Sequence, residues 1–314
     1  MENNRIMRFL AVILLIACVI VAVTLIRVRY DMDYVPAEAV DDLVAVMERD
    51  GIRIDRNIIS RKRENGSVYM FASEGYTGTV AELLSGSAVK ETYAVPDGEL
   101  ILLENGDRCE FGENFTFRYQ TEDADIFSPN IVDLRNYSNS RLPKDAEITV
   151  EAVRSFLADG SRSFSSGREV DVEVTIDGIW EYEGVDYVLC SRTIDDVSIT
   201  GNLVLCTVEG EKVTAAYGTW CFFTSGTSYS AQLADILNIL FNVKKELAPS
   251  PAGSAGISSG TAVTIESIKF CYSLYFFGEE KNFCLIPCWQ ITTDTRGELI
   301  YNAINGTLYT KNIE

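Results

Sequence analysis

Residues 170–177, with the sequence VDVEVTID, alternate apolar and polar side chains without a break. Successive side chains of a β-strand point to opposite faces of its sheet, so this segment predicts a strand with one buried and one wet face. Three further apolar runs follow, at residues 185–192, 203–208 and 213–223. Together they predict an antiparallel meander, and they make a sheet the organising feature of this half of the chain.

Amphipathic helices are expected on both sides of the meander. Apolar residues recur at helical spacing between Pro36 and Gly51, over residues 150–159 and over residues 230–246. The pattern Thr79-x-x-Glu82 is typical of a capping box and predicts a brief additional helix.

Short strands are expected at residues 52–59, 68–72, 99–103 and 115–119, and three more close the chain, with a tight hairpin turn at Asn305-Gly306. The predicted fold class is therefore α+β: a single N-terminal transmembrane helix followed by antiparallel-sheet subdomains with packed helices. The expected boundaries are an N-terminal α+β subdomain at 31–120, a polar connection at 121–147 and a C-terminal α+β subdomain at 148–314.

The transmembrane prediction rests on residues 9–26, FLAVILLIACVIVAVTLI, which carry no charge and only Thr24 as a polar interruption. A helix of this length reaches about 27 Å, close to the hydrocarbon thickness of a bilayer. Two alternatives stay open. One is a cleaved signal peptide, and the other is a lipobox, Leu15-Ile16-Ala17-Cys18, in which Cys18 carries a lipid.

Orientation does not follow from charge, because two arginines flank the apolar run on each side. Only residues 1–8 precede the run, and so short a tail is expected to stay in the cytoplasm. The chain is therefore predicted to be a single-pass protein of the cell membrane, with its large C-terminal domain outside.

Composition excludes several classes of function. The chain has 46 acidic and 27 basic residues, a net charge of −19, which disfavours nucleic acid as a partner. It has no histidine, so Ser-His-Asp triads, Cys-His pairs and HExxH zinc sites are absent. An S-x-x-K match at Ser87 and Lys90 has no accompanying Lys-Thr-Gly, and no nucleotide-binding motif is present. The chain is expected to be no enzyme and to need no cofactor or metal.

The eight cysteines lie mostly inside apolar, strand-like runs, and seven of them follow the N-terminal apolar segment. Cysteines in such runs usually pack as small buried hydrophobic residues, so free thiols are favoured over disulfides, which stay open as the alternative.

The C-terminal third carries a recognisable order of segments. A helix precedes VTIESIK at 263–269, a tyrosine (Tyr272 or Tyr275), LIPCWQITT at 285–293 and YNAING at 301–306. This order, over roughly residues 228–310, resembles the last strands of the YycH/YycI-type regulators of the WalK sensor kinase, and it has features of PepSY-like domains. The residues that carry the resemblance are Pro287, Trp289, Tyr301, Asn302, Ala303 and Gly306. For each of them a purely structural role, in shaping a strand or a turn, is the alternative.

The resemblance implies a non-enzymatic, membrane-anchored extracytoplasmic protein that modulates a two-component sensor histidine kinase together with a sister regulator. It also implies that the N-terminal helix could contact another helix, through its small or polar residues Ala17, Cys18, Ala22 and Thr24. Two alternatives remain: an extracytoplasmic module that binds cell-wall material or a small ligand, and a histidine-free enzyme.

Overall fold

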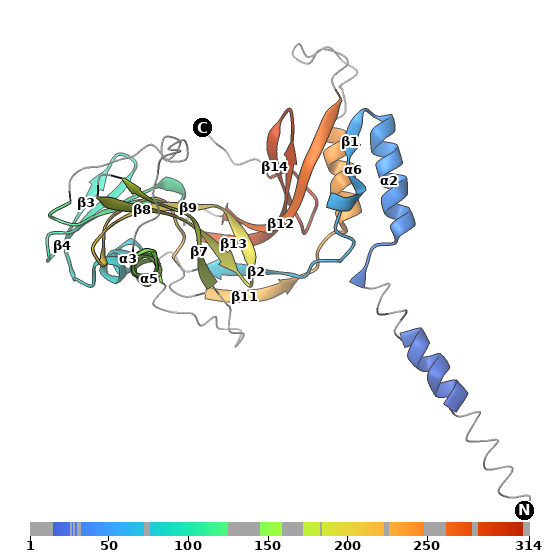
Figure 1. Ribbon diagram of the computed structural model, residues 1–314, viewed down its shortest axis with the longest axis horizontal. Helices are drawn as coiled ribbons and strands as arrows, with labels where there is room; N and C mark the ends of the chain where they lie inside the picture. Colours follow the sequence, from blue (N-terminus) through green and yellow to red (C-terminus); the bar gives the residue numbers. More distant parts are fainter. Residues whose placement is uncertain are drawn as a thin grey trace, which may run out of the picture. The chain divides into compact units, whose positions relative to one another are not determined.

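The computed structural model of the chain describes residues 15–25, 27, 29, 33–71, 76–124, 145–158, 172–182, 184–222, 226–247, 262–277 and 282–309. Strands predominate over helices and form a large mixed sheet (Figure 1). The chain divides into two compact units, and neither unit is continuous in sequence. Unit 1 is Met1–Gly66, Gln232–Lys269 and Cys288–Glu314; unit 2 is Ser67–Ala231 and Phe270–Pro287.

Unit 1 packs helices α2 (Ala37–Arg49) and α6 (Ile236–Leu247) with β1 (Ile52–Ile54), β14 (Gly297–Asn302) and the unit 1 portions of β12 (Val263–Phe277) and β13 (Asn282–Thr293). β1 runs parallel to β12, whereas β14 runs antiparallel to β13. The two helices bury one stripe each, and this apolar burial stabilises the unit. The buried residues are Val40, Leu43 and Met47 of α2 and Ile236, Ile239, Leu240, Val243 and Leu247 of α6.

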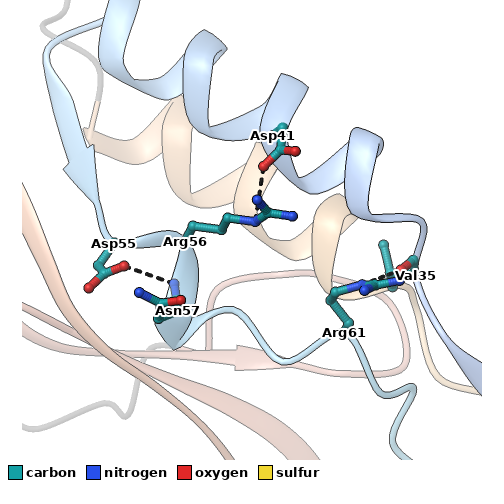
Figure 2. Close-up of polar contacts among 6 residues, drawn as sticks. All are labelled: Val35, Asp41, Asp55, Arg56, Asn57 and Arg61. Atoms are coloured by element: carbon teal, nitrogen blue, oxygen red, sulfur yellow. Dashed lines mark hydrogen bonds and ion pairs between the residues drawn. The ribbon is translucent and has the colours of Figure 1, made fainter.

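Polar contacts secure the segment that follows α2 (Figure 2). Arg56 Nε lies 3.0 Å from Asp41 Oδ1 of α2, and Asp55 caps the short 3-10 turn that carries Arg56. Arg61 Nε donates to the carbonyl of Val35 over 3.0 Å. The Arg56 and Asp41 side chains are about half exposed, so their ion pair orders this segment more than it stabilises it.

Unit 2 contains the predicted meander, which is confirmed, and its strands continue into a second antiparallel run. In sequence order the strands are β3 (Val89–Val95), β4 (Gly98–Leu103), β5 (Arg108–Gly112), β6 (Thr116–Gln120), β7 (Val172–Tyr182), β8 (Val185–Ile194), β9 (Val197–Glu209) and β10 (Lys212–Thr219). β7 to β10 pair successively, and β10 also pairs with β6, which leads through β5 and β4 to β3 at the edge. β2 (Gly66–Phe71) pairs with β13, and β11 (Gly226–Ala231) follows β2 in the sheet order.

Two helices, α3 (Tyr76–Ser85) and α5 (Ala146–Leu157), pack on the core of unit 2 (Figure 1). α3 contributes Val80, Ala81 and Leu84, and α5 contributes Val153 and Leu157. Aromatic residues from the sheet complete the same cluster, including Phe117, Tyr119 and Trp220. One side of each helix is therefore buried, and the other remains available to solvent or to a partner.

The predicted fold class is wrong in two respects. Strands predominate, and the sheet is mixed, because β1 and β9 each pair in parallel with β12. Antiparallel neighbours can be predicted from adjacent segments, whereas parallel pairing joins segments distant in sequence. No helix in the described part of the chain is both long enough and apolar enough to cross a membrane.

The predicted subdomain boundaries also differ from the two units, because α2 shares a unit with the last strands of the chain. Several predicted features lie partly or wholly outside the described residues. They are the tail 1–8, residues 9–14 and 26 of the apolar run, residues 125–144 of the connection, and residues 170 and 171 of the opening strand.

Two helices begin elsewhere than predicted. Residues 230 and 231 belong to β11, and α6 begins only at Ile236, where Asp235 Oδ1 accepts from the Leu237 amide over 3.0 Å. The buried side of α6 carries Ile239 and Val243, and Phe241 is exposed. α3 begins at Tyr76, so Thr79 lies inside the helix and not at its cap.

Candidate functional site

A hollow of about 700 Å³ opens on unit 2, between the C-terminal end of α3, one side of α5 and the turn that joins β9 to β10. We call it the groove. Residues 83–85 of α3 and Gly86, which follows the helix, form one wall. Glu211 of the turn and Lys212 and Val213 at the start of β10 also line the groove. Tyr119 of β6 also lines it. The size lies within the usual range for small-molecule and peptide pockets.

α5 contributes more lining residues than any other element of the groove. Its side chains fall into three rows at four-residue spacing. Residues four apart lie above one another on a helix, so each row keeps one chemical character along the wall. The first row is buried in the core, the second is apolar and lines the groove, and the third is polar and also lines it. These rows are Thr149, Val153 and Leu157; Ile148, Ala152 and Phe156; and Glu147, Glu151 and Ser155.

Tyr119 supplies a rigid part of the lining. Its hydroxyl donates to Asp107 Oδ2 over 2.6 Å, and its ring centroid lies 4.9 Å from that of Phe156. Burial raises the pKa of the Tyr119 hydroxyl above its ordinary value, and the Asp107 carboxylate raises it further. The hydroxyl therefore stays protonated and bound to Asp107, and it holds the floor in place without supplying a reactive oxygen.

The rim of the groove is acidic. Glu147 and Glu151 of α5 and Glu211 of the turn are all exposed, and Lys212 is the one cation among the residues that line the groove. The two helices also present apolar side chains to solvent, since Leu83 is 37% exposed and Ile148 is 45% exposed. An apolar floor with carboxylates around it favours binding of a cationic, partly apolar ligand.

Metal binding and catalysis find no support in the described residues. No group of three or more Cys, Asp or Glu side chains that could hold a metal lies among residues 15–309 where the structure describes them. Ser87 and Lys90 lie in a bend and in β3, so the S-x-x-K match lacks the helix that this motif requires.

The predicted helix-contact residues lie on the N-terminal helix. Ala17, Cys18, Ala22 and Thr24 are all exposed, and Thr24 Oγ1 donates to the carbonyl of Ile20 over 2.8 Å. At about 100° per residue, Ala17 and Thr24 share one side of the helix, and Cys18 and Ala22 share another. The four residues thus form two small surfaces and not one continuous stripe.

The family-like residues cluster at β13 and β14. Trp289 and Tyr301 pair directly across the two strands, and both are buried. Pro287 is buried inside β13, between the residues that pair with β2 and those that pair with β14. Because proline has no N–H to donate, it suits this change of partner. β13 has β2 and β12 as neighbours in the sheet order and is therefore not an edge strand.

The end of β14 is a compact turn. Asn302 Oδ1 accepts from the amides of Ile304 (2.8 Å) and Asn305 (3.3 Å), and Ala303 is fully buried. Gly306 has φ +73°, as expected for a glycine in the final turn, and its carbonyl accepts from Asn242 Nδ2 over 2.8 Å. These contacts are structural, and none of the six family-like residues lines the groove.

Sequence reasoning missed the groove, although a signal was present. Ile148 of α5 is 45% exposed and lies next to two glutamates at four-residue spacing, whereas Ala152 and Phe156 of the same row pack against the core. A large apolar side chain left exposed beside the core stripe of a helix indicates a second contact surface.

Comparisons with known proteins add little. No protein family matches the sequence, and no curated protein matches it. The structure has some similarity to the crystal structure of an uncharacterized protein from Eubacterium rectale ATCC 33656, with a TM-score of 0.43 and 10% sequence identity. The match covers 83% of this chain and 90% of that chain.

Proposed function

We propose that this protein is a membrane-anchored regulator that acts outside the cytoplasm by protein–protein contact and not by catalysis. One observation carries the proposal: the helix over residues 15–25 is apolar and exposed on all its sides. Leu15 (67% exposed), Ile20 (60%) and Val21 (57%) point in different directions around the helix axis. A helix that is apolar all round requires apolar surroundings, such as lipid or other helices.

The anchor in this proposal is the apolar run 9–26, with residues 1–8 in the cytoplasm and residues 31–314 outside. The partner suggested by the resemblance of residues 228–310 is a sensor histidine kinase, together with a sister regulator. The net charge of −19 disfavours nucleic acid as the partner. The exposed apolar residues of the groove supply a further contact surface on unit 2.

Anchorage is tested by extracting membranes of the native host with alkaline carbonate, which releases peripheral proteins. We expect the full-length chain to stay in the pellet, and protease added to intact spheroplasts to digest residues 31–314. Release by carbonate would contradict the anchor, and protection from protease would contradict the orientation.

The partner is tested by cross-linking in cells, followed by purification of the full-length chain and identification of what is captured. A sensor histidine kinase is the expected product. A matched variant replaces residues 9–26 with an unrelated hydrophobic helix, and weaker recovery of the kinase would show that the helix itself is recognised. A capture experiment that enriches no kinase would overturn the proposed partner.

A second candidate, a module that binds a small ligand or cell-wall material, has one observation in its favour: the groove has a suitable volume and an aromatic side chain, Phe156, in its lining. A ligand of that kind would raise the thermal stability of the full-length chain by an amount that grows with the logarithm of its affinity. If cell-wall fragments leave the melting temperature unchanged, they are excluded as ligands.

A further inference from the structure

We propose that the groove of unit 2 binds a peptide segment of a partner protein in which apolar side chains alternate with lysine or arginine. This deepens the proposed function and rests on it, since it names the chemistry by which a partner is recognised. The partner class follows from three features of the groove: its exposed apolar residues, the position of its carboxylates and the scarcity of cations.

Both helices of the groove, α3 and α5, supply apolar surface for binding the peptide. Leu83 of α3 and Ile148 of α5 are large side chains that solvent reaches, at 37% and 45% exposure, and Ala152 and Phe156 are half-buried beside Ile148. Removing apolar surface from water is favourable, so an apolar side chain placed between these helices would be stabilised. A purely charged ligand would leave this surface exposed.

The electrostatic contribution comes from three carboxylates. None of Glu147, Glu151 and Glu211 forms an ion pair with another residue in the described part of the chain. They are therefore available to attract cations, and two cations, Lys212 of the lining and Arg154 one turn along α5 from Glu151, offset part of their charge. Attraction of this kind selects lysine or arginine and repels phosphate, nucleic acid and anionic lipid headgroups.

The spacing of the acidic row also fits a peptide. Glu147 and Glu151 are one turn apart on α5, which separates them by about 6 Å along the helix axis. Cationic side chains two residues apart on an extended peptide are separated by about 6.6 Å. A segment with alternating residues can thus place cations on the glutamates and its apolar side chains on the row containing Ile148.

The test uses the full-length chain in zwitterionic lipid nanodiscs and a fluorescein-labelled octapeptide of alternating leucine and lysine, followed by fluorescence anisotropy. We expect this peptide to bind, and the matching peptides of leucine and glutamate and of serine and lysine to bind at least ~10-fold more weakly. Binding equal to that of empty nanodiscs, or equal binding of the serine and lysine peptide, would overturn the proposal.

Variants locate the site. We expect Glu147→Gln combined with Glu151→Gln to weaken binding about 5- to 10-fold, and Ile148→Ser to weaken it about 5-fold. The matched control is Glu38→Gln with Asp42→Asn, which removes two exposed charges at the same spacing from the first turns of α2 in unit 1. The control is expected to stay within about 2-fold of the unchanged protein. Equal losses in the control and the groove variants would refute the assignment.

The outcome separates this proposal from the one on which it rests. If the peptide fails to bind while cross-linking still captures a kinase, the groove assignment falls and the regulatory function stands. If carbonate releases the chain from membranes and no kinase is captured, the proposed function falls even where the peptide binds. Circular dichroism of each variant confirms that exposed substitutions leave the fold intact.

Discussion

The hydroxyl of Tyr119 donates a hydrogen bond of 2.6 Å to Oδ2 of Asp107, and both side chains are buried, at 2% and 3% exposure. Asn105 Nδ2 donates to the same carboxylate oxygen over 2.8 Å. The pair joins β6 to the turn between β4 and β5 and fixes the floor of the groove. A buried carboxylate depends on such donors, because its charge has left water.

Tyr119→Phe is therefore expected to destabilise unit 2 by about 1–3 kcal/mol, since it removes a donor to a buried charged acceptor. Urea unfolding followed by circular dichroism measures the loss. The control is Tyr217→Phe on the neighbouring strand β10. Because Tyr217 is exposed, loss of its hydroxyl should change the free energy of unfolding by less than about 0.5 kcal/mol. Equal effects of the two substitutions would contradict the structural role of the Tyr119 hydrogen bond.

Tyr301→Phe, unlike Tyr119→Phe, is not expected to lower the free energy of unfolding. Tyr301 is buried, and its hydroxyl has no hydrogen-bond partner among the residues that the structure describes. The pKa of Tyr301 is raised to about 12, mainly by burial and also by the Glu246 carboxylate, while Arg296 acts in the opposite direction. Removing an unsatisfied buried hydroxyl should leave the free energy of unfolding unchanged or raise it by up to about 1 kcal/mol. A clear loss of stability in urea unfolding would show that this hydroxyl has a partner.

Gly306→Ala is predicted to cost more than Gly297→Ala, although both glycines have a positive φ, +73° and +66°. A Cβ at Gly306 would lie 2.8 Å from Asn242 Nδ2, whereas a Cβ at Gly297 meets nothing within 4 Å. Each substitution carries the backbone strain of about 1–2 kcal/mol, and Gly306→Ala also displaces the Asn242 side chain from the Gly306 carbonyl. Hydrogen exchange of α6 measures the difference, and equal protection in the two variants would contradict it.

Alkaline pH is expected to destabilise the fold through its buried thiols. Burial raises the pKa of Cys109 to about 12, with a further contribution from Asp107, and burial raises the pKa of Cys284 to about 11. Because the unfolded thiols lose their protons near their ordinary value of about 9, the unfolded state binds fewer protons above that pH. The stabilisation from protonated thiols is thus complete below about pH 9 and is lost as the pH rises toward 11 and 12.

The urea midpoint measured between pH 8 and pH 10.5 checks this expectation. It should fall with pH, and it should fall less steeply in Cys109→Ala, which removes one of the shifted groups. Cys18→Ala is the control, because Cys18 is exposed and its removal should leave the slope unchanged. A midpoint that is flat or rises with pH would contradict the assignment.

Local sequence patterns predicted correctly which side chains of a strand or helix are buried, because this depends on the spacing of neighbouring residues. The alternation from Val172 to Asp177 appears in β7 as half-buried and exposed side chains in turn. Val40, Leu43 and Met47 are buried in α2 as their spacing predicts, and Lys244 and Lys245 occupy the last turn of α6. The cysteines are free thiols, and the seven that follow Cys18 are buried.

Prediction failed where a local pattern had to compete with contacts from elsewhere. Ser230 and Ala231 carry a helical pattern but lie in β11, and α6 begins where Asp235 can cap it. The parallel pairing of Ile52 with Val263 joins opposite ends of the chain, and no local signal announces it. The mixed sheet and the discontinuous units follow from pairings of this kind.

By itself, the sequence determined the acidic charge, the absence of histidine chemistry, the apolar run at 9–26 and the two-faced strands, because composition and periodicity depend on nothing beyond neighbouring residues. Only the tertiary structure decided the groove. Its walls come from α3, α5 and the turn between β9 and β10, three segments that are ordinary when taken alone. They meet because each buries its own apolar stripe on one core, and Leu83, Ile148, Glu147 and Glu151 are left facing outward around the hollow between them.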